Sequence, residues 1–173
     1  MALSNNTKPK HFWPVLLTVL LLDCSTKRLA VEALSPPDVP HDVLGDVFRL
    51  TLAYNPGIAT GIHIGSRWVL TAAASVVIAI LWRAYRRTAP GETLRLVALA
   101  LLTGGAIGNV IDRVRWSRGV VDFVDLGVGA VRFWTFNVAD VAVTVGALLL
   151  AWVLQYGPEA AVEVERKGPG AAA

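Results

Sequence analysis

The sequence predicts an α-helical membrane protein with four transmembrane helices and a small β-sheet on one side of the membrane. Hydrophobic residues make up 54% of the 173-residue chain and charged residues only 17%, and the mean hydropathy is +0.54. An ordinary soluble domain is less apolar and more charged. The length argues for a single domain. Arginines beside anionic lipid headgroups explain the formal charge of +3 and the pI of about 9.4 better than nucleic-acid binding does.

Four apolar stretches predict the transmembrane helices, at residues 12–33, 64–84, 93–111 and 137–156. A bilayer core about 30 Å thick needs ~20 residues of helix. The last three apolar runs are shorter than this, so their helices are expected to extend through small, polar and aromatic flanks. The first run resembles a signal peptide ending at Cys24, but Asp23 is not a small residue and the helical pattern continues beyond it, so we expect a retained helix.

Two segments between the helices, residues 35–63 and 112–136, are long for simple connections. Both contain β-branched and aromatic residues in partial alternation, which predicts short strands at Asp46–Asn55 and on both sides of a glycine-rich turn that follows Asp122. We expect these strands to form a small sheet on the outer membrane surface. The tail at residues 157–173 is rich in Pro, Glu, Gly and Ala, which is typical of disorder.

A compact group of arginines predicts the orientation of the helices: Arg83, Arg86, Arg87 and Arg95. The remaining Lys and Arg residues make the overall count equal on the two sides, so the positive-inside rule decides only through this cluster. Placing the cluster in the cytoplasm puts the N-terminal arm, residues 1–11, and the 157–173 tail there as well. The predicted sheet then lies outside.

Asp122 and Asp140 are the strongest candidates for chemistry. An ionised carboxylate near the hydrocarbon core costs about 2–4 kcal/mol, so one kept there usually has a function. Asn137 and Asp140 stand three apart where a helix begins, and capping alone would explain the asparagine. Capping does not explain Asp122, which follows two valines in a strand-like run. If the two carboxylates meet, they would share a proton and could activate water, as in an aspartic protease. Their spacing alone leaves this open.

Other polar residues lie inside the predicted first and third helices. Asp23 and Lys27 share one helix face, where they either neutralise each other or contribute to a site. Asn109 and Arg113 also share a face, beside Asp112, and form either an interfacial anchor or a polar shell that holds another group. Just before them, the spacing of Gly104 and Gly108 allows close packing of two helices.

Cysteine and histidine usage argues against metal and thiol chemistry. The single cysteine, Cys24, excludes an internal disulfide framework and a cysteine-based zinc site. The three histidines, His11, His41 and His63, lack metal-ligand spacing and have no convincing route to Cys24. We therefore expect no metal, no cofactor and no cysteine-peptidase mechanism.

Taken together, these motifs resemble the lipoprotein signal peptidases, or signal peptidase II, of bacteria. The matching segments occur in family order and are "DCSTK" (Asp23–Lys27), "YNPGIATG" (Tyr54–Gly61), "GGAIGNVIDR" (Gly104–Arg113), "VVDFVD" (Val120–Asp125) and "FNVADVAVTVG" (Phe136–Gly146). Any one segment is a weak signal, but the set is specific. After Asn55 the family usually shows Gly-Ala-Ala/Ser-Phe, whereas Ile58, Ala59 and Thr60 follow Gly57 here. The missing Phe bears on the packing and substrate contacts of that loop.

The resemblance implies a four-helix membrane aspartyl protease domain at residues 12–156 with an outer β-cradle. Such enzymes cut the signal peptide from prolipoproteins, just before a cysteine that carries diacylglyceryl. By motif match, the catalytic pair would be Asp122 and Asp140. The active-site shell would be Asp23, Lys27, Asn55, Gly108, Asn109, Arg113, Asn137 and Ala139. Asp112 and Asp125 are nearby acids without a catalytic assignment, and Asp125 is expected on the cradle surface.

The resemblance also implies a multi-pass protein of the bacterial cytoplasmic membrane, with both termini inside and the active site outside. The expected partners are lipid-modified prolipoproteins and membrane lipids, without nucleic acid, and the expected state is a monomer. The alternative is a small proton-coupled transporter or membrane scaffold, with Asp23, Lys27 and Asp140 as a relay. Transport predicts acids near mid-helix and inverted repeats. Here the acids cluster at one membrane face, and no repeat is evident.

Overall fold

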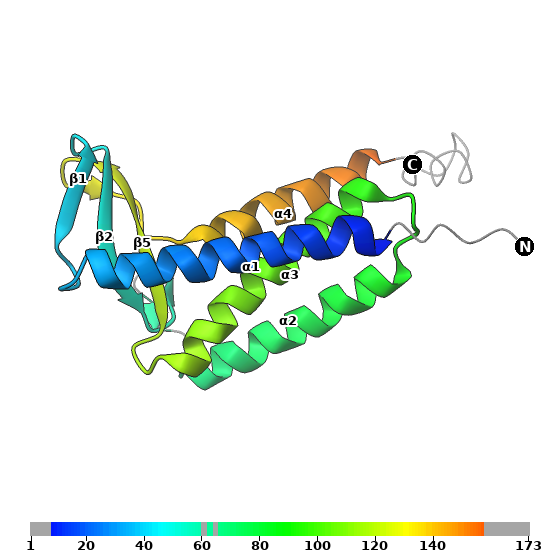
Figure 1. Cartoon of the computed structure of the whole chain (residues 1–173), viewed down its shortest axis with the longest axis horizontal. Helices are drawn as coiled ribbons and strands as arrows, with labels where there is room; N and C mark the ends of the chain where they lie inside the picture. The colour runs from blue at the N-terminus through cyan, green and yellow to red at the C-terminus, as the bar shows by residue number, and fades with distance from the viewer. Residues whose placement is uncertain (1–7, 60–61, 64–65, 158–173) are drawn as a thin grey trace, which may run out of the picture.

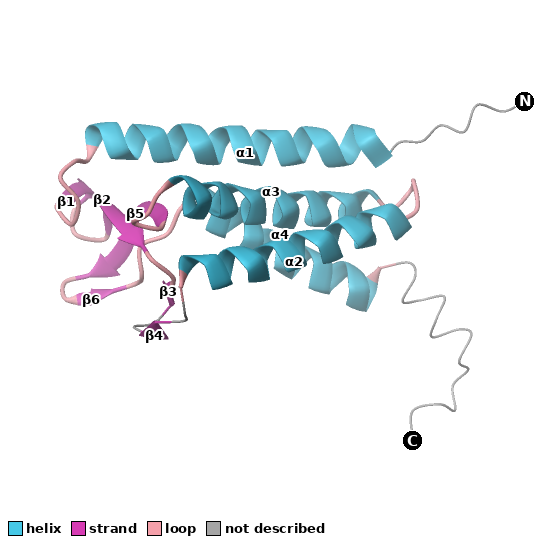
Figure 2. Ribbon diagram, turned by 90° about the horizontal axis from the view of Figure 1, so that it is seen from below, coloured by secondary structure: helices cyan, strands magenta, loops and turns pink. Residues whose placement is uncertain are grey.

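The computed structural model describes residues 8–59, 62–63 and 66–157 as a bundle of helices with a sheet at one end (Figure 1). The helices are α1 (Lys8–Ala33), α2 (Arg67–Arg87), α3 (Thr93–Arg115) and α4 (Val138–Tyr156). The strands are β1 (Pro40–Leu44), β2 (Phe48–Asn55), β3 (Ile58–Ala59), β4 (Ile62–His63), β5 (Val120–Val128) and β6 (Val131–Arg132). Figure 2 shows the strands gathered at the end of the bundle where α1 and α3 finish. The predicted combination of four helices and a small sheet is confirmed.

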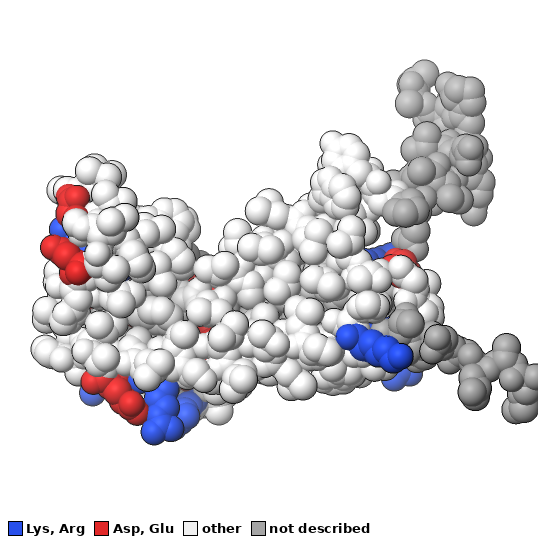
Figure 3. Space-filling view, turned by 45° about the horizontal axis from the view of Figure 1, so that its top comes forward, with Lys and Arg blue, Asp and Glu red and all other residues white. Residues whose placement is uncertain are grey.

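Three of the helices, α2, α3 and α4, are long and apolar enough to cross a membrane. The fourth, α1, has 26 residues and is therefore about 39 Å long at 1.5 Å per residue. Its buried positions include Asp23 and Lys27, which lie against the other helices. On the face drawn in Figure 3, charged side chains gather at the two ends of the molecule, and the helical surface between them is almost free of charge. This distribution suits a bilayer around the middle of the bundle.

Several predicted helix boundaries were wrong by a few residues. α1 begins at Lys8, so residues 8–11 of the predicted arm are helical. α2 runs on to Arg87 and α3 to Arg115, beyond the apolar runs that defined them. Arginine is a good helix former, and its aliphatic stem covers apolar surface while the guanidinium reaches the polar zone. Of the predicted disordered tail, only Gly157 lies within the described residues.

Helix α3 is the centre of the bundle, because it packs against α1, α2 and α4. Gly104 faces α1, where an added Cβ would lie 3.1 Å from Val19 Cβ. Gly105 faces α4, where an added Cβ would collide with the carbonyl oxygen of Ala139. The close packing predicted from the spacing of Gly104 and Gly108 is confirmed, and Gly105 adds a contact that was not predicted. Because Gly104 and Gly105 lack side chains, α3 packs closely against both α1 and α4.

The sheet has the antiparallel order β1-β2-β5-β6. A cluster of buried hydrophobic residues joins it to α1. Leu52, Val121 and Phe123 pack there against the last turns of α1. In the register of β2 with β5, Ala53 lies opposite Asp122 and Asn55 lies opposite Val120. Strand β1 was not predicted, because all five of its residues are exposed and its sequence lacks alternation.

Candidate active site

Asp122 and Asp140 come from different elements and meet in one hydrogen-bond network. Asp122 is the third residue of β5, and Asp140 lies in the first turn of α4. Asn137 touches both: its side-chain Nδ2 donates to Asp122 Oδ1 at 2.6 Å, and its backbone N–H donates to Asp140 Oδ2 at 3.2 Å. The structure therefore brings together the two acids that the sequence placed 18 residues apart.

Local backbone pairing explains how Asn137 reaches Asp122. Phe136 forms an antiparallel bridge with Val124, through N–H to carbonyl bonds of 2.8 and 3.0 Å. Asn137 then caps α4, with its side-chain oxygen accepting the N–H of Asp140 at 3.0 Å. Asp140 returns a bond to the Asn137 backbone, which completes a capping box. The predicted capping role of Asn137 is confirmed, and the same residue also contacts both carboxylates.

The environment of Asp122 favours its protonated form. The residue is only 2% exposed. Burial, followed by the nearby charge of Asp140, raises the pKa of Asp122 to about 7, although hydrogen bonds from Asn137 and Asn55 oppose this rise. Near neutral pH this carboxyl can therefore either hold or release a proton, which is the property a general acid–base needs.

Lys27 lies at the centre of a buried network of charged and polar side chains next to the two acids. Its ammonium lies 2.8 Å from Asp23 Oδ2, 2.9 Å from Asp112 Oδ2 and 3.0 Å from Asn109 Oδ1. These three acceptors use all three ammonium protons. The Asp23–Lys27 pairing expected within α1 is present, and it extends across to α3.

The two acids beside Lys27 each hold the backbone next to a member of the pair. Asp23 Oδ1 accepts the N–H of Ala139 at 2.9 Å, one residue before Asp140. Asp112 Oδ2 accepts the N–H of Val121 at 3.1 Å, one residue before Asp122. Asp112 is therefore part of the shell, although the sequence analysis did not assign it. Its buried position, with 6% exposure, was not predictable from its place at a helix end.

Asn109 links this network to Asp140. Its Nδ2 donates to Asp140 Oδ1 at 2.8 Å, and its Oδ1 accepts from Lys27 and, at 3.2 Å, from Asn137. One turn earlier, Gly108 leaves room for α1, because an added Cβ would collide with Asp23 Oδ2 and would lie 3.5 Å from the Ala139 Cβ. The glycine is needed for the approach of a charged group as well as for helix packing.

Asn55 and Arg113 border the acids from two other directions. Asn55, at the end of β2, hydrogen-bonds Asp122 and also accepts the N–H of Gly57 at 2.9 Å. Arg113 donates to the carbonyl oxygen of Asn109 at 3.3 Å, and its charge interacts with both Asp122 and Asp140. The structure thus places every predicted shell residue in or beside this network.

Asp125 has a different role from the surface position that was predicted. It is 8% exposed, pairs with Arg132 at 2.8 Å and accepts the hydroxyl of Thr51 at 3.1 Å. The sequence did not reveal this ion pair, because Arg132 lies on β6, across a turn from Asp125. The hydrogen bonds and the ion pair of Asp125 join it to Thr51 and Arg132, so it stabilises the sheet.

A groove lies beside Asp140, between the first two turns of α4 and the aromatic residues that precede the helix. It has a volume of about 250 Å³ and is lined by Phe133, Trp134 and Val145 among others. The Phe133 and Trp134 rings lie 3.7 Å apart and both are about half exposed. Among the described residues, no three His, Cys, Asp or Glu side chains are grouped so that they could hold a metal ion.

Comparison with known proteins agrees with this geometry. The signal peptidase (SPase) II family matches residues 15–155. The chain is 42% identical over 153 residues to the lipoprotein signal peptidase of Coxiella burnetii, covering 83% of this chain and 90% of that one. It is 38% identical over 139 residues to the lipoprotein signal peptidase of Moorella thermoacetica, covering 80% and 88%.

A solved structure described as a bacterial membrane enzyme has the same fold. It superposes with a TM-score of 0.73 at 28% sequence identity, covering 82% of this chain and 90% of that chain. The chain is therefore a multi-pass membrane protein, as the hydropathy of its helices also indicates. It belongs to the signal peptidase II family of aspartyl peptidases, which process prolipoproteins.

Proposed function

We propose that Asp122 and Asp140 are the catalytic pair with which this peptidase cuts lipid-modified prolipoproteins, N-terminal to the diacylglyceryl cysteine. The observation that carries this proposal is the contact of one side chain, Asn137, with both carboxylates. It supports a pair held close enough for the charge on Asp140 to favour a proton on Asp122.

In this proposal Asp122 starts protonated and Asp140 starts ionised. Asp140 takes a proton from water as the water oxygen adds to the scissile carbonyl carbon, and Asp122 gives its proton to the carbonyl oxygen. Asp140 then passes its proton to the amide nitrogen while Asp122 recovers one from a hydroxyl of the diol. The carbon–nitrogen bond breaks, which leaves a carboxylic acid and an amine and restores the starting pair.

The remaining site residues are proposed to position this pair. Asn109 and Asn137 orient the carboxylates, and Asn55 tunes Asp122 through its hydrogen bond. Asp23 and Asp112 hold the backbone N–H groups of Ala139 and Val121, next to the two catalytic acids. Lys27 offsets the charge of Asp23 and Asp112, and Gly108 leaves space for Asp23. Arg113 supplies positive charge beside both acids during the reaction.

We also propose that residues 12–156 form the single protease domain and that the sheet faces the extracytoplasmic side. The arginine cluster at residues 83–95 supports this orientation, because it lies at the bundle end remote from the sheet (Figure 1). Both termini are then cytoplasmic. One chain supplies every residue of the network, which favours a monomer that works among membrane lipids in a bacterial cytoplasmic membrane, without nucleic acid.

The cleavage site is tested with a purified precursor, either diacylglyceryl-modified or unmodified, and mass spectrometry of the products. We expect a product that begins with the lipid-modified cysteine and at least a hundredfold slower cutting of the unmodified precursor. Cleavage at another bond, or equal rates on the two precursors, would contradict the proposal.

The orientation is tested by cysteines introduced at Ala89 and Ser117, both exposed, in a Cys24→Ala background. A membrane-impermeant thiol reagent applied to intact cells should label position 117 and leave position 89 unlabelled. The reverse pattern would invert the proposed topology.

A further inference from the structure

Basic residues at the sheet end of the bundle differ in how firmly carboxylates hold them. Lys27, Arg49 and Arg132 pair with carboxylates at 2.7–2.9 Å. Arg115 has no ion pair among the described residues, and its guanidinium lies over the Trp116 ring, 5.1 Å from the centroid. Arg28 pairs with Glu32, but both side chains are more than half exposed, at 81% and 58%. Such an exposed pair is weak, so neither Arg28 nor Arg115 is held by a strong ion pair.

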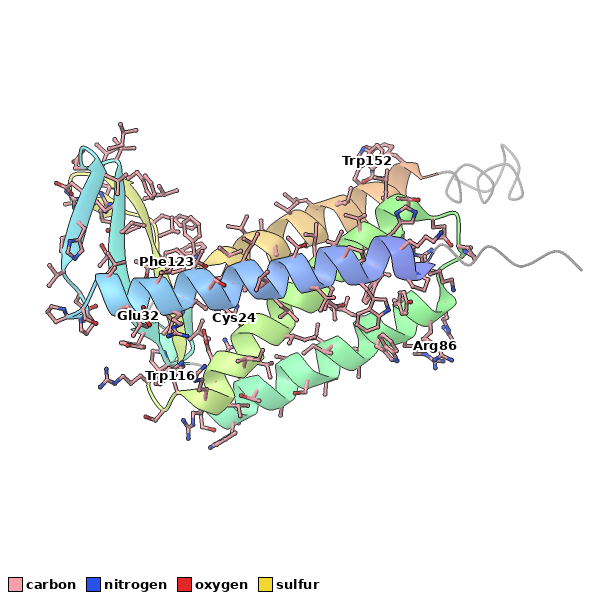
Figure 4. All side chains as sticks on the ribbon, viewed as in Figure 1. Cys24, Glu32, Arg86, Trp116, Phe123 and Trp152 are labelled. Carbon is pink, nitrogen blue, oxygen red and sulfur yellow. The ribbon has the colours of Figure 1, made fainter. Side chains whose placement is uncertain are left out.

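These two cations line the same cavity. It has a volume of about 620 Å³ and lies between the last turns of α1, the end of α3 and the start of β5. Arg28 and Glu32 come from α1, Arg115 is the last residue of α3, and Trp116 follows it as the C-cap. Figure 4 shows Glu32 and Trp116 on neighbouring elements near the sheet. The two helices run in the same direction, so their side chains face the cavity at matching levels.

The cavity changes character with depth. Cys24 and Ile111 line it one helical turn before Arg28 and Arg115, respectively, and therefore farther from the sheet. Figure 4 shows Cys24 farther along α1 from the sheet than Glu32. The deeper level presents Cys24 and Ile111 on its exposed side, with Lys27 and Asp112 on the inner wall, whereas the upper level carries Arg28, Arg115 and Trp116 together with Glu32. This order matches a phospholipid, whose chains lie deeper in the bilayer than its phosphate.

We propose that this cavity binds an anionic phospholipid, with its phosphate between Arg28 and Arg115 and an acyl chain along Cys24 and Ile111. Basic pockets between transmembrane helices are suited to anionic headgroups. The inner wall carries the Lys27–Asp112 ion pair at 2.9 Å. Glu32 offsets one of the two arginines, so the lining keeps an excess of positive charge for the phosphate.

The site is separate from the catalytic groove. Asp122 and Asp140 do not line it, and the groove beside Asp140 shares none of its lining residues. The diacylglyceryl group of a lipoprotein substrate carries no phosphate, so arginine recognition distinguishes a membrane phospholipid from the substrate. Because Lys27 and Asp112 form its wall, a bound lipid also shields the rear of the catalytic network from water.

Binding is measured on the full chain in detergent through quenching of Trp116 fluorescence. The probe is phosphatidylglycerol brominated near the headgroup end of its chains, and the signal of a Trp116→Phe variant is subtracted. We expect saturable quenching. Arg115→Gln should weaken the affinity about fivefold, and the double change with Arg28→Gln about twenty-five-fold, at roughly a factor of five per arginine.

Arg67→Gln is the matched control. Arg67 also lies over a tryptophan, 4.6 Å from the Trp68 centroid, but it does not line the cavity. The Arg67→Gln variant should bind brominated phosphatidylglycerol with the same affinity as the wild type. Brominated diacylglycerol should quench weakly, and free glycerol phosphate at the same concentration should not compete.

Three results would overturn the proposal. Equal quenching by brominated diacylglycerol would show a chain groove without phosphate recognition. Competition by glycerol phosphate as strong as that of the lipid would show a site for free phosphate. Unchanged affinity in the double arginine variant, or equal binding of brominated phosphatidylcholine, would show that the arginines do not select an anionic lipid. None of these readouts depends on peptidase activity.

Discussion

Removing the Asn55 side chain should shift the pH dependence of cleavage to higher pH. Asn55 hydrogen-bonds the Asp122 carboxylate and so lowers a pKa that burial and Asp140 have raised to about 7. A hydrogen bond to a charged group contributes about 1.5–3 kcal/mol, and one pKa unit corresponds to about 1.36 kcal/mol. Because Asp122 is only 2% exposed, little of this effect is screened by water. Asn55→Ala should therefore raise the pKa of Asp122 further, by about 1–2 units.

The sign follows from the protonation state that the mechanism requires. Asp122 must hold a proton at the start, so activity falls as the pH rises through its pKa. In wild type, kcat/KM should decline above about pH 7, and in Asn55→Ala the decline should begin near pH 8–9. The assay is cleavage of a diacylglyceryl-modified precursor over pH 5–10. The absolute rate will also fall, because Asn55 holds the N–H of Gly57, so the position of the decline is the readout.

Thr51→Val is the control for this shift. Thr51 lies on the same strand as Asn55, but its hydroxyl donates to Asp125 instead of Asp122. Its alkaline decline should coincide with that of wild type. An unmoved decline in Asn55→Ala, or a move toward acid, would refute the argument that this hydrogen bond and the proton on Asp122 control the reaction.

Three further predictions concern the supporting residues. Lys27→Met strands two buried carboxylates and should lower the free energy of unfolding in detergent by about 3–5 kcal/mol, whereas Lys10→Met, at an exposed position, should lower it little. Gly108→Ala forces a methyl group onto Asp23 and should cost about 1–3 kcal/mol and most of the activity, whereas Gly91→Ala, with open space around it, should cost neither. Cys24→Ala should keep substantial activity, and EDTA should not inhibit; complete loss in EDTA that zinc restores would contradict a metal-free mechanism.

Hydropathy carried enough information to predict the helices, whereas the pairing of Asp122 with Asp140 was inferred from the family resemblance, because their spacing of 18 residues leaves it open. The helix faces of Asp23 with Lys27 and of Asn109 with Arg113 follow from a period of 3.6 residues. Helix ends were harder to predict, because arginines such as Arg87 and Arg115 continue a helix beyond its apolar run. Strand β1 has no buried face and so left no alternating pattern.

Contacts between distant segments account for most of what the sequence did not reveal. The Lys27–Asp112 ion pair joins α1 to α3, and it depends on how closely glycines let these helices approach. Asp125 was expected on the cradle surface, but it is only 8% exposed and pairs with Arg132, which follows it across a turn. The family resemblance left Asp112 unassigned, and only the fold showed that it holds the backbone of Val121, one residue before Asp122.

The central claim is that Asp122 and Asp140 act together as the catalytic pair. Its most direct test is the cleavage rate of Asp122→Asn, Asp140→Asn and Asp125→Asn at matched amounts of folded protein, on a diacylglyceryl-modified precursor. An amide nearly preserves shape but cannot ionise, so each of the first two changes should lower the rate by at least ~10²–10⁴, and their combination should be little worse than either. Asp125→Asn should keep most of the activity per folded molecule, since Asp125 pairs with Arg132 away from the pair. A near wild-type rate in either of the first two variants, or inactivity confined to Asp125→Asn, would contradict the claim.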